Sequence, residues 1–376
     1  MVRPDLRPMR ALPVLEHRRS ELERCVYCPK LCRSACPVSN AEPKETLIPW
    51  GKMSMVSFVA HGDVPLDASH ASPAWACTGC YACREACDHR NDVAGTLVEA
   101  RAALTAAGAG HAAAASATAR FDAHEERTRA AMQSHRARAG SAADPSADHA
   151  LLVGCGYARH AGAEAVDAIA AGAALAGGRV AVADGCCGLP LHLAGDAPRF
   201  RAHAERFAAS VDRAAALLVA DAGCAMALRT HYPAAGVAIR PKVELLVERA
   251  ARDLAALETV GAGEGARYHD PCQLGRGLGV YEAPRAVLTR ALGRAPAEFD
   301  ARREHAACSG AGGLVPVTMP GVARTIAGTR ADEHRRAGGG KVITACASSL
   351  RAFRREGLDA DDIVSWIARA LRARTA

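Results

Sequence analysis

Eight cysteines in the first hundred residues form two compact runs whose residue type and spacing suit metal binding. The runs read CVYCPKLCRSACPVSN and CTGCYACREACDHRND. Their thiols belong to Cys25, Cys28, Cys32 and Cys36 in the first run and to Cys77, Cys80, Cys83 and Cys87 in the second. Three closely spaced thiolates on a tight turn can bind three corners of one iron–sulfur cubane, and the fourth thiolate then points away. We therefore predict two [4Fe-4S] clusters.

A pair of four-thiolate zinc sites is the alternative interpretation of these runs. Such sites favour two CxxC pairs separated by a longer loop, and compact four-cysteine runs fit that geometry poorly. His61, His70 and His89 lie nearby in the sequence. With eight thiols available, we expect these histidines to be surface or packing residues.

The two runs resemble those of two-cluster ferredoxins, in which the fourth cysteine of each run ligates the other cluster. The resemblance implies that Cys87 completes cluster I with the first three cysteines of the first run. Cys36 would complete cluster II with the first three of the second run. The first run has one extra residue between its second and third cysteines, and Asp88 replaces a usual proline. Neither change removes a ligand.

The other seven cysteines lie in the second half, where five of them follow short strand-like runs. The runs ALLVG, RVAVAD, ALLVAD, ARYHD and KVITA lead into Cys155, Cys186, Cys224, Cys272 and Cys346, respectively. Helical Ala/Leu-rich stretches alternate with them, which predicts parallel α/β units. The functional crevice of such sheets lies beyond the carboxyl ends of the strands, where we expect these cysteines.

The second half also repeats itself. An offset of 122 residues takes Cys186 to Cys308, Cys187 to Ser309 and Cys224 to Cys346, and an offset of 117 takes Cys155 to Cys272. This predicts two homologous lobes.

The predicted organisation has four parts. Residues 1–100 form a ferredoxin-type domain with two [4Fe-4S] clusters, and residues 101–148 form an Ala/Gly-rich linker with a helical stretch around FDAHEERTRAAMQ. Residues 149–262 and 263–376 form the two lobes. The fold class is therefore α+β multidomain: an α-helical ferredoxin-like module, then two pseudo-repeated α/β lobes facing each other across the cysteine site.

The lobes resemble the cysteine-rich CCG domain, on the segments DGCCGLP, AACSGAGGLVP and HDPCQLGRGLGVY. This domain occurs in heterodisulfide reductases and in the iron–sulfur subunits of glycolate oxidase, anaerobic glycerol-3-phosphate dehydrogenase and lactate utilisation. Only the linker falls outside the resemblance. It implies that the lobe cysteines bind metal and that Cys186, Cys187 and Cys308 take part in catalysis.

The lobes depart from the fullest form of that family, in which five cysteines per lobe hold a noncubane [4Fe-4S] cluster that cleaves disulfides. Lobe one keeps four cysteines, with Ala227 at the last position, and suits one conventional cluster or a redox-active metal. Lobe two keeps three, with Ser309 and Ser349 at the other two. It suits a cluster with Ser309 or His305 as fourth ligand, or none. The alternative is that these cysteines no longer bind metal and are buried as small apolar residues.

Composition narrows the class and location of the protein. The formal charge of +7 is spread along the chain without a dense basic block, so nucleic acid is not an expected partner. No apolar run is long enough for a signal peptide or a membrane span. We therefore expect a cytoplasmic protein. In that reducing compartment, 15 cysteines indicate metal binding or catalysis rather than a disulfide framework. Peripheral association with a membrane stays open.

The predicted function is an iron–sulfur electron-transfer subunit of an oxidoreductase. It would relay electrons between an FAD-linked flavoprotein, or a ferredoxin, and a disulfide or quinone-type acceptor, because the chain has no dinucleotide fingerprint of its own. The first alternative is a simple ferredoxin-like carrier whose degenerate lobes serve for docking. A thiol–disulfide enzyme that uses Cys186 and Cys187 directly is least favoured, since vicinal cysteines close only a strained ring.

Overall fold

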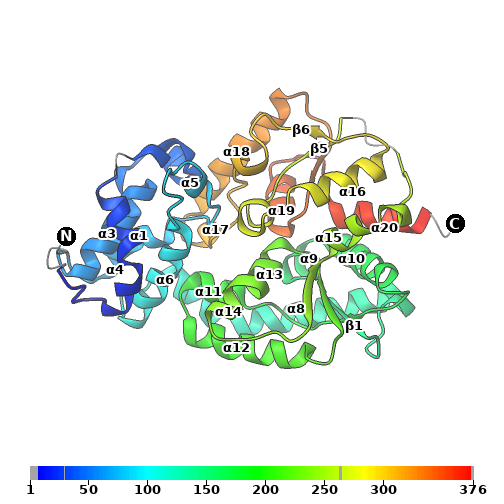
Figure 1. Ribbon diagram of the computed structural model, residues 1–376, viewed down its shortest axis with the longest axis horizontal. Coiled ribbons are helices and arrows are strands. Elements are labelled where there is room, and N and C mark those ends of the chain that lie inside the picture. Colours follow the sequence, from blue (N-terminus) through cyan, green and yellow to red (C-terminus); the bar gives the residue numbers. More distant parts are fainter. Residues whose placement is uncertain (1–6, 29, 262–264, 374–376) are drawn as a thin grey trace. The chain divides into compact units, whose positions relative to one another are not determined.

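The structure is a computed structural model that describes residues 7–28, 30–261 and 265–373, and the chain divides into two compact units (Figure 1). Unit 1 comprises Met1–Arg120, Pro190–Ala197 and Gly310–Ile326, and unit 2 comprises Phe121–Leu189, Pro198–Ser309 and Ala327–Ala376. The expected lobe boundary at residues 262 and 263 lies outside the described residues. Two short segments of the second half thus belong to the unit of the first half.

Unit 1 is helical, and no strand forms in the part of it that the structure describes. Its α-helices are α1 (Arg19–Val26), α2 (Pro37–Ala41), α3 (Pro49–His61), α4 (Ala68–Ala71), α5 (Ala82–Glu85), α6 (Val93–Ala106), α7 (Ala112–Ala119), most of α11 (Leu189–Ala194) and α17 (Val315–Thr318). Short 3-10 helices link them: η1 (Pro13–Arg18), η2 (Leu31–Ala35), η3 (Glu45–Leu47) and η4 (Ser72–Trp75).

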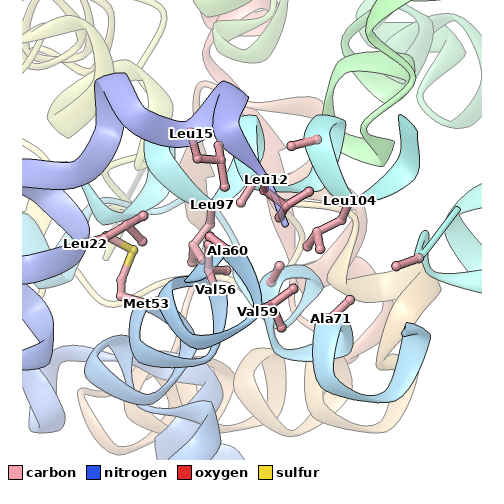
Figure 2. Close-up of a cluster of buried hydrophobic side chains, with 14 of the residues drawn as sticks. Leu12, Leu15, Leu22, Met53, Val56, Val59, Ala60, Ala71, Leu97 and Leu104 are labelled. Carbon is pink, nitrogen blue, oxygen red and sulfur yellow. The ribbon is translucent and has the colours of Figure 1, made fainter. Parts of the chain in front are cut away.

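The core of unit 1 gathers between α1, α3 and α6 (Figure 2). Leu22 of α1, Met53 and Val59 of α3, and Leu97 of α6 are each fully buried in it. Burying a side chain of this size stabilises a fold by about 1.5–3 kcal/mol. This core holds in place the helices that flank both cysteine runs.

Unit 2 contains two four-stranded parallel sheets. The first has the order β2-β1-β3-β4, formed by β1 (His149–Leu152), β2 (Ala181–Val182), β3 (Ala216–Val219) and β4 (Lys242–Leu245). The second has the order β6-β5-β7-β8, formed by β5 (Arg267–Tyr268), β6 (Ala297–Glu298), β7 (Val342–Thr344) and β8 (Ala360–Asp362). All five strands expected from the sequence form, and the parallel α/β prediction is confirmed. Of the edge strands in these two sheets, β2 was expected and β4, β6 and β8 were not.

Helices connect the strands of unit 2. They are α8 (Phe121–Ala139), α9 (Cys155–His160), α10 (Gly162–Leu175), α12 (Ala197–Val211), α13 (Ala222–Met226), α14 (Tyr232–Ala234), α15 (Leu246–Arg252), α16 (Glu282–Leu292), most of α18 (Pro320–Arg336), α19 (Ala347–Arg355) and α20 (Ile363–Ala373). Short 3-10 or π turns are η5 (Gly140–Ala142), η6 (Ala227–His231), η7 (Leu254–Ala256), η8 (Gln273–Gly277) and η9 (Arg303–His305). Across the described ranges, no helix is both long and apolar enough to cross a membrane.

The segment expected to be a linker differs from that expectation. Its helical stretch is α8, as predicted, but α8 is part of unit 2 rather than a spacer. Met132 and His135 of α8 are buried, and the His135 Nε2 donates to the carbonyl oxygen of Ala158 at 2.8 Å. The Ala-rich composition of this segment does not indicate that these two side chains are buried.

Candidate iron–sulfur sites

The first thiol group of unit 1 surrounds Cys25, which lies one residue before the end of α1. Burial raises the pKa of the Cys25 thiol to about 12. The thiols close enough to add to this rise are those of Cys28, Cys32 and Cys87. This is the set of four that the ferredoxin resemblance implied for cluster I.

The second thiol group lines one small cavity of unit 1. Its four thiols are those of Cys36, Cys77, Cys80 and Cys83. The rest of the wall is formed by the polar residues Lys52 and Thr78 and by Pro37, Pro49, Tyr81, Val93 and Ala94. Burial raises the pKa of the Cys83 thiol well above its usual value, and the neighbouring thiols of Cys77, Cys80 and Cys36 add to the effect. The cavity therefore holds the set implied for cluster II.

Hydrogen-bond donors point at thiols of both groups. The Asn91 amide donates to Cys25 Sγ at 3.1 Å, and the Lys52 ammonium donates to Cys36 Sγ at 3.3 Å. A backbone N–H two residues after a cysteine also points back at its sulfur in each run: Lys30 to Cys28 and Gly79 to Cys77, both at 3.4 Å. Such donors stabilise thiolates and tune cluster potentials.

These two groups fit [4Fe-4S] clusters by the chemistry of their donors. None of the eight thiols forms a disulfide with another described residue. Buried thiols with raised pKa values ionise only when a nearby cation compensates their charge, and cluster iron supplies that charge. Four thiols per group match the four irons of each cluster. The ligand roles of the individual cysteines stay predictions.

A third thiol group lies in unit 2, where the first sheet ends. Cys155 begins α9 after β1, the pair Cys186 and Cys187 follows β2, and Cys224 lies in α13 after β3. The Cys186 Sγ lies 3.5 Å from the Cys155 Sγ. Hydrogen bonds from Cys186 and Cys224 lower the pKa of the Cys187 thiol well below its usual value. The structure thus brings together the four lobe-one cysteines named from the sequence.

Surrounding side chains hold the loop of this third group through its backbone. His203, which is buried, donates from Nε2 to the Cys186 carbonyl oxygen at 2.7 Å. The hydroxyl of buried Tyr232 donates to the Cys187 carbonyl oxygen at 2.9 Å. These two hydrogen bonds fix the backbone of Cys186 and Cys187 and do not involve their thiols.

His124 is a site residue that the sequence reasoning missed. One of its ring nitrogens and the sulfurs of Cys155 and Cys186 all lie within 4.8 Å of one another. Arg159 donates to its Nδ1 at 2.5 Å, which fixes the ring orientation. His124 lies on α8, in the stretch expected to be a linker, and its spacing from any cysteine carries no signal. Only the packing of α8 against α9 could reveal it.

The lobe-two cysteines follow the strands of the second sheet, as the lobe-one cysteines follow those of the first. Cys272 lies between β5 and η8, Cys308 follows β6, and Cys346 follows β7 at the position just before α19. At the two positions where cysteines are missing, the buried hydroxyls of Ser309 and Ser349 hydrogen-bond each other at 2.9 Å.

His305, considered as a fourth ligand, has a side chain 73% exposed and lies beside Glu304. The structure therefore gives lobe two weaker support as a metal site than lobe one.

Two family models match the chain, and together they cover the cysteine-bearing segments. A 4Fe-4S dicluster domain matches residues 21–91, and a cysteine-rich domain named CCG matches residues 149–229 and 266–353. The first match contains both cysteine runs. The second falls once on each sheet of unit 2.

Curated relatives are similar to this chain over different shares of its length. One chain of the dihydromethanophenazine:CoB–CoM heterodisulfide reductase of Methanosarcina mazei is 29% identical over 206 residues, which is 50% of this chain and 50% of the relative. One chain of the fumarate reductase (CoM/CoB) of Methanothermobacter marburgensis is 27% identical over 351 residues, which is 87% of this chain and 66% of the relative. A probable membrane-anchored ferredoxin of Chromohalobacter salexigens is 42% identical over 87 residues, 23% of this chain and 13% of the relative. The chain spans about half the length of the first of these relatives.

Proposed function

Since this chain belongs to the CCG-domain iron–sulfur oxidoreductase family, we propose that it is an electron-transfer subunit of an oxidoreductase. Its N-terminal 4Fe-4S dicluster domain would exchange single electrons with a partner, and its CCG half would deliver them to a disulfide or quinone-type acceptor. The partner we propose is an FAD-linked flavoprotein subunit or a ferredoxin. A cytoplasmic location is part of the proposal, because metal-binding thiols outside disulfides suit a reducing compartment.

The observation that carries the proposal is the third thiol group, at the end of the first sheet of unit 2. A simple carrier needs no further redox site beyond its two clusters. Here Cys155, Cys186, Cys187 and Cys224 lie together with a histidine within reach of two of them. The arrangement supports a metal-thiolate site at the carboxyl ends of β1 and β3, where parallel sheets place their functional groups.

The residue assignments follow from this proposal. Cluster I would be held by Cys25, Cys28, Cys32 and Cys87, and cluster II by Cys36, Cys77, Cys80 and Cys83. The metal of lobe one would be held by Cys155, Cys186, Cys187 and Cys224, and that of lobe two, if loaded, by Cys272, Cys308 and Cys346. When bound, these clusters supply one-electron transfer. We also propose that the two CCG matches are pseudo-repeated lobes spanning residues 149–262 and 263–376.

The chain's own residues would organise the two-electron step. Reduction of a disulfide breaks its S–S bond and needs two electrons and two protons, so single electrons must be collected at one place. Cys186 and Cys187 would be the catalytic pair of lobe one, with Cys308 as their counterpart in lobe two. His203 and Tyr232 would hold the pair by its carbonyl groups during turnover.

Iron and sulfide quantification with EPR on the anaerobically purified full chain tests the proposal. Loaded N-terminal clusters alone give about eight iron per chain, and a loaded lobe one gives about twelve. The dithionite-reduced chain, freed of dithionite, is then mixed with a small disulfide or a water-soluble quinone.

We expect acceptor-dependent loss of the cluster EPR signal, and its rate should fall strongly in Cys187→Ala. Equal rates in Cys187→Ala and the unmodified chain, at about eight iron in both, would overturn the assignment of lobe one.

One observation favours a second candidate function, a carrier whose lobe two serves only for docking. The hydrogen bond between the hydroxyls of Ser309 and Ser349 gives each of them a partner within the protein. Under this candidate, replacing Cys272, Cys308 and Cys346 by Ala leaves turnover with the flavoprotein unchanged. Loss of turnover with the full N-terminal iron content retained rejects it.

A further inference from the structure

Two buried cations lie against the cysteines of cluster II. Lys52 and Arg101 are each only 1% exposed. Lys52 donates from Nζ to Cys36 Sγ at 3.3 Å, and Arg101 donates from a terminal nitrogen to the Cys77 carbonyl oxygen at 3.0 Å. These two contacts place both positive charges directly beside the cysteines assigned to cluster II.

The hydrogen-bond partners given for Arg101 are neutral backbone carbonyl groups. Besides Cys77, it donates to the carbonyl oxygens of Ala74 and Leu193 at 2.9 Å and of Gly313 at 3.0 Å. Backbone carbonyl groups satisfy its donors but carry no formal negative charge. A guanidinium stays protonated in proteins, so a full positive charge is built in beside cluster II.

The hydrogen bond to a cysteine sulfur assigned to cluster I comes from a neutral side chain, whereas that to Cys36 of cluster II comes from an ammonium group. The Asn91 amide donates to Cys25 Sγ at 3.1 Å and to the Glu21 carbonyl oxygen at 2.8 Å, and Asn91 is itself buried. An amide dipole stabilises added negative charge less than an ammonium at the same distance does. The two clusters therefore differ in the charge of the groups that this chain places around them.

We infer that Lys52 and Arg101 make cluster II the higher-potential cluster of the pair and the point where electrons leave the dicluster domain. Each reduction adds one negative charge to a cluster, and a buried positive charge nearby stabilises the reduced state. An electron on reduced cluster I would pass to oxidised cluster II, so that one cluster is oxidised by one electron and the other reduced by one. The inference rests on the proposed function and on the crossed ligand sets.

Arg101 also donates hydrogen bonds to two segments that follow the cysteine motifs of the CCG lobes in sequence. Leu193 belongs to the segment Pro190–Ala197, which follows the Cys186 and Cys187 pair in sequence, and Gly313 belongs to Gly310–Ile326, which follows Cys308. Both segments are part of unit 1, and Arg101 binds a carbonyl group of each. One side chain thus links the cluster II turn to segments covalently continuous with both cysteine motifs.

The Gly310–Ile326 segment packs its backbone directly on the cluster II turn. An added Cβ at Gly313 would lie 2.0 Å from the Cys77 carbonyl oxygen, and one at Gly312 would lie 2.5 Å from the Thr78 carbonyl oxygen. Glycine is required here because no side chain fits between the two backbones. Close backbone packing of this kind, beside Cys77 and in a segment that directly follows Ser309 in the chain, suits an electron exit at cluster II.

An EPR-monitored redox titration of the loaded full chain tests the inference. Lys52→Gln removes the charge and keeps an N–H donor for Cys36, and Lys44→Gln is the control, since Lys44 is an exposed lysine paired with Glu42. We expect Lys52→Gln to lower the midpoint potential of one cluster and to leave the other unchanged. Lys44→Gln should leave both unchanged. Unaltered potentials in Lys52→Gln at full iron content overturn the inference.

The order in which the two clusters are reduced gives a second measurement. It does not depend on whether Lys52→Gln assembles its clusters. Cys83→Ser should perturb the EPR signal that is reduced first, and Cys28→Ser the signal that is reduced second. The opposite order overturns the inference, even though both clusters are present. Absence of N-terminal iron in the unmodified chain would instead reject the proposed function, so the two failures are distinguishable.

Discussion

Asp221 joins two cysteine-bearing turns of unit 2, because its carboxylate accepts a hydrogen bond from the backbone N–H of Ala347 at 3.0 Å. Ala347 follows Cys346, and the other carboxylate oxygen of Asp221 caps α13 through the N–H groups of Gly223 and Cys224. One side chain therefore holds the start of α13 and the start of α19 together. Burial raises the pKa of this carboxyl group, and the N–H of Ala347 opposes that rise.

We predict that Asp221→Ala lowers the free energy of unfolding by about 2 kcal/mol, because a helix cap and a bridging hydrogen bond are both lost. Chemical denaturation at matched iron content measures the change. The control is Asp212→Ala, which removes a half-exposed carboxylate paired with exposed Arg240. Similar losses in the two variants would show that the bridge contributes little.

Restoring the missing thiols of lobe two should create a metal site. The hydroxyls of Ser309 and Ser349 lie 2.9 Å apart at positions where the family carries cysteines, so the double variant Ser309→Cys with Ser349→Cys places five thiols in this lobe. We expect about four additional iron per chain on reconstitution. Ser348→Cys, which adds a thiol at an exposed neighbouring position, is the control and should add none. An unchanged iron count in the double variant would show that the lobe geometry excludes a cluster.

Gly313→Ala should destabilise unit 1 more than backbone strain alone can explain. Gly313 has a φ of +62°, and an added Cβ would meet the Cys77 carbonyl oxygen at 2.0 Å. Gly62→Ala is the matched control, since Gly62 has a φ of +80° and nothing within 4 Å of an added Cβ. We expect about 1 kcal/mol of destabilisation for the control and more than about 2 kcal/mol for Gly313→Ala. Equal unfolding free energies for the two variants would contradict the close contact.

Stability should fall with rising pH because of Asp362. This side chain is fully buried, and burial raises its pKa to about 8, opposed by a hydrogen bond from the Val364 N–H. The unfolded carboxyl group titrates near about 3.9, so the folded chain binds one more proton between about pH 4 and 8. The contribution of Asp362 to the free energy of unfolding is fully present below about pH 4. It falls by up to about 1.4 kcal/mol per pH unit as the pH rises toward about 8.

Urea unfolding of the unmodified chain and of Asp362→Asn from about pH 6 to 8 measures this contribution. Asparagine cannot ionise, so the difference in unfolding free energy between the two proteins should change in favour of Asp362→Asn as the pH rises. Asp359→Asn, at a more exposed position paired with Lys341, is the control. Parallel curves for the unmodified chain and Asp362→Asn would contradict the raised pKa.

Local sequence was enough to predict the parts of this protein whose signal lies within a few residues. The two cysteine runs needed only their own spacing, and the family model for a 4Fe-4S dicluster domain agrees with them. β1, β2, β3, β5 and β7 were predicted because short strand-like runs end at a cysteine. Parallel strands buried on both faces are apolar along most of their length, so their composition alone can identify them.

Three of the edge strands, β4, β6 and β8, depended on tertiary pairing. β4, β6 and β8 include charged residues such as Lys242, Glu298 and Asp361, and each forms because a buried neighbouring strand offers unpaired backbone groups. These three strands are short and carry charged residues, so no apolar run marks them, whereas the edge strand β2 has one. Their short, mixed sequences resemble loops.

The remaining features were decided by contacts between residues far apart in the chain. Arg101 reaches carbonyl groups of residues 92 and 212 positions away, and His124 meets cysteines from a stretch with the composition of a linker. A charged residue in an Ala-rich helix gives no sign that it will be buried, because burial depends on which distant backbone packs over it. Residue types and their spacing are enough to predict iron–sulfur cysteines, whereas contacts between distant residues set which charges lie around them.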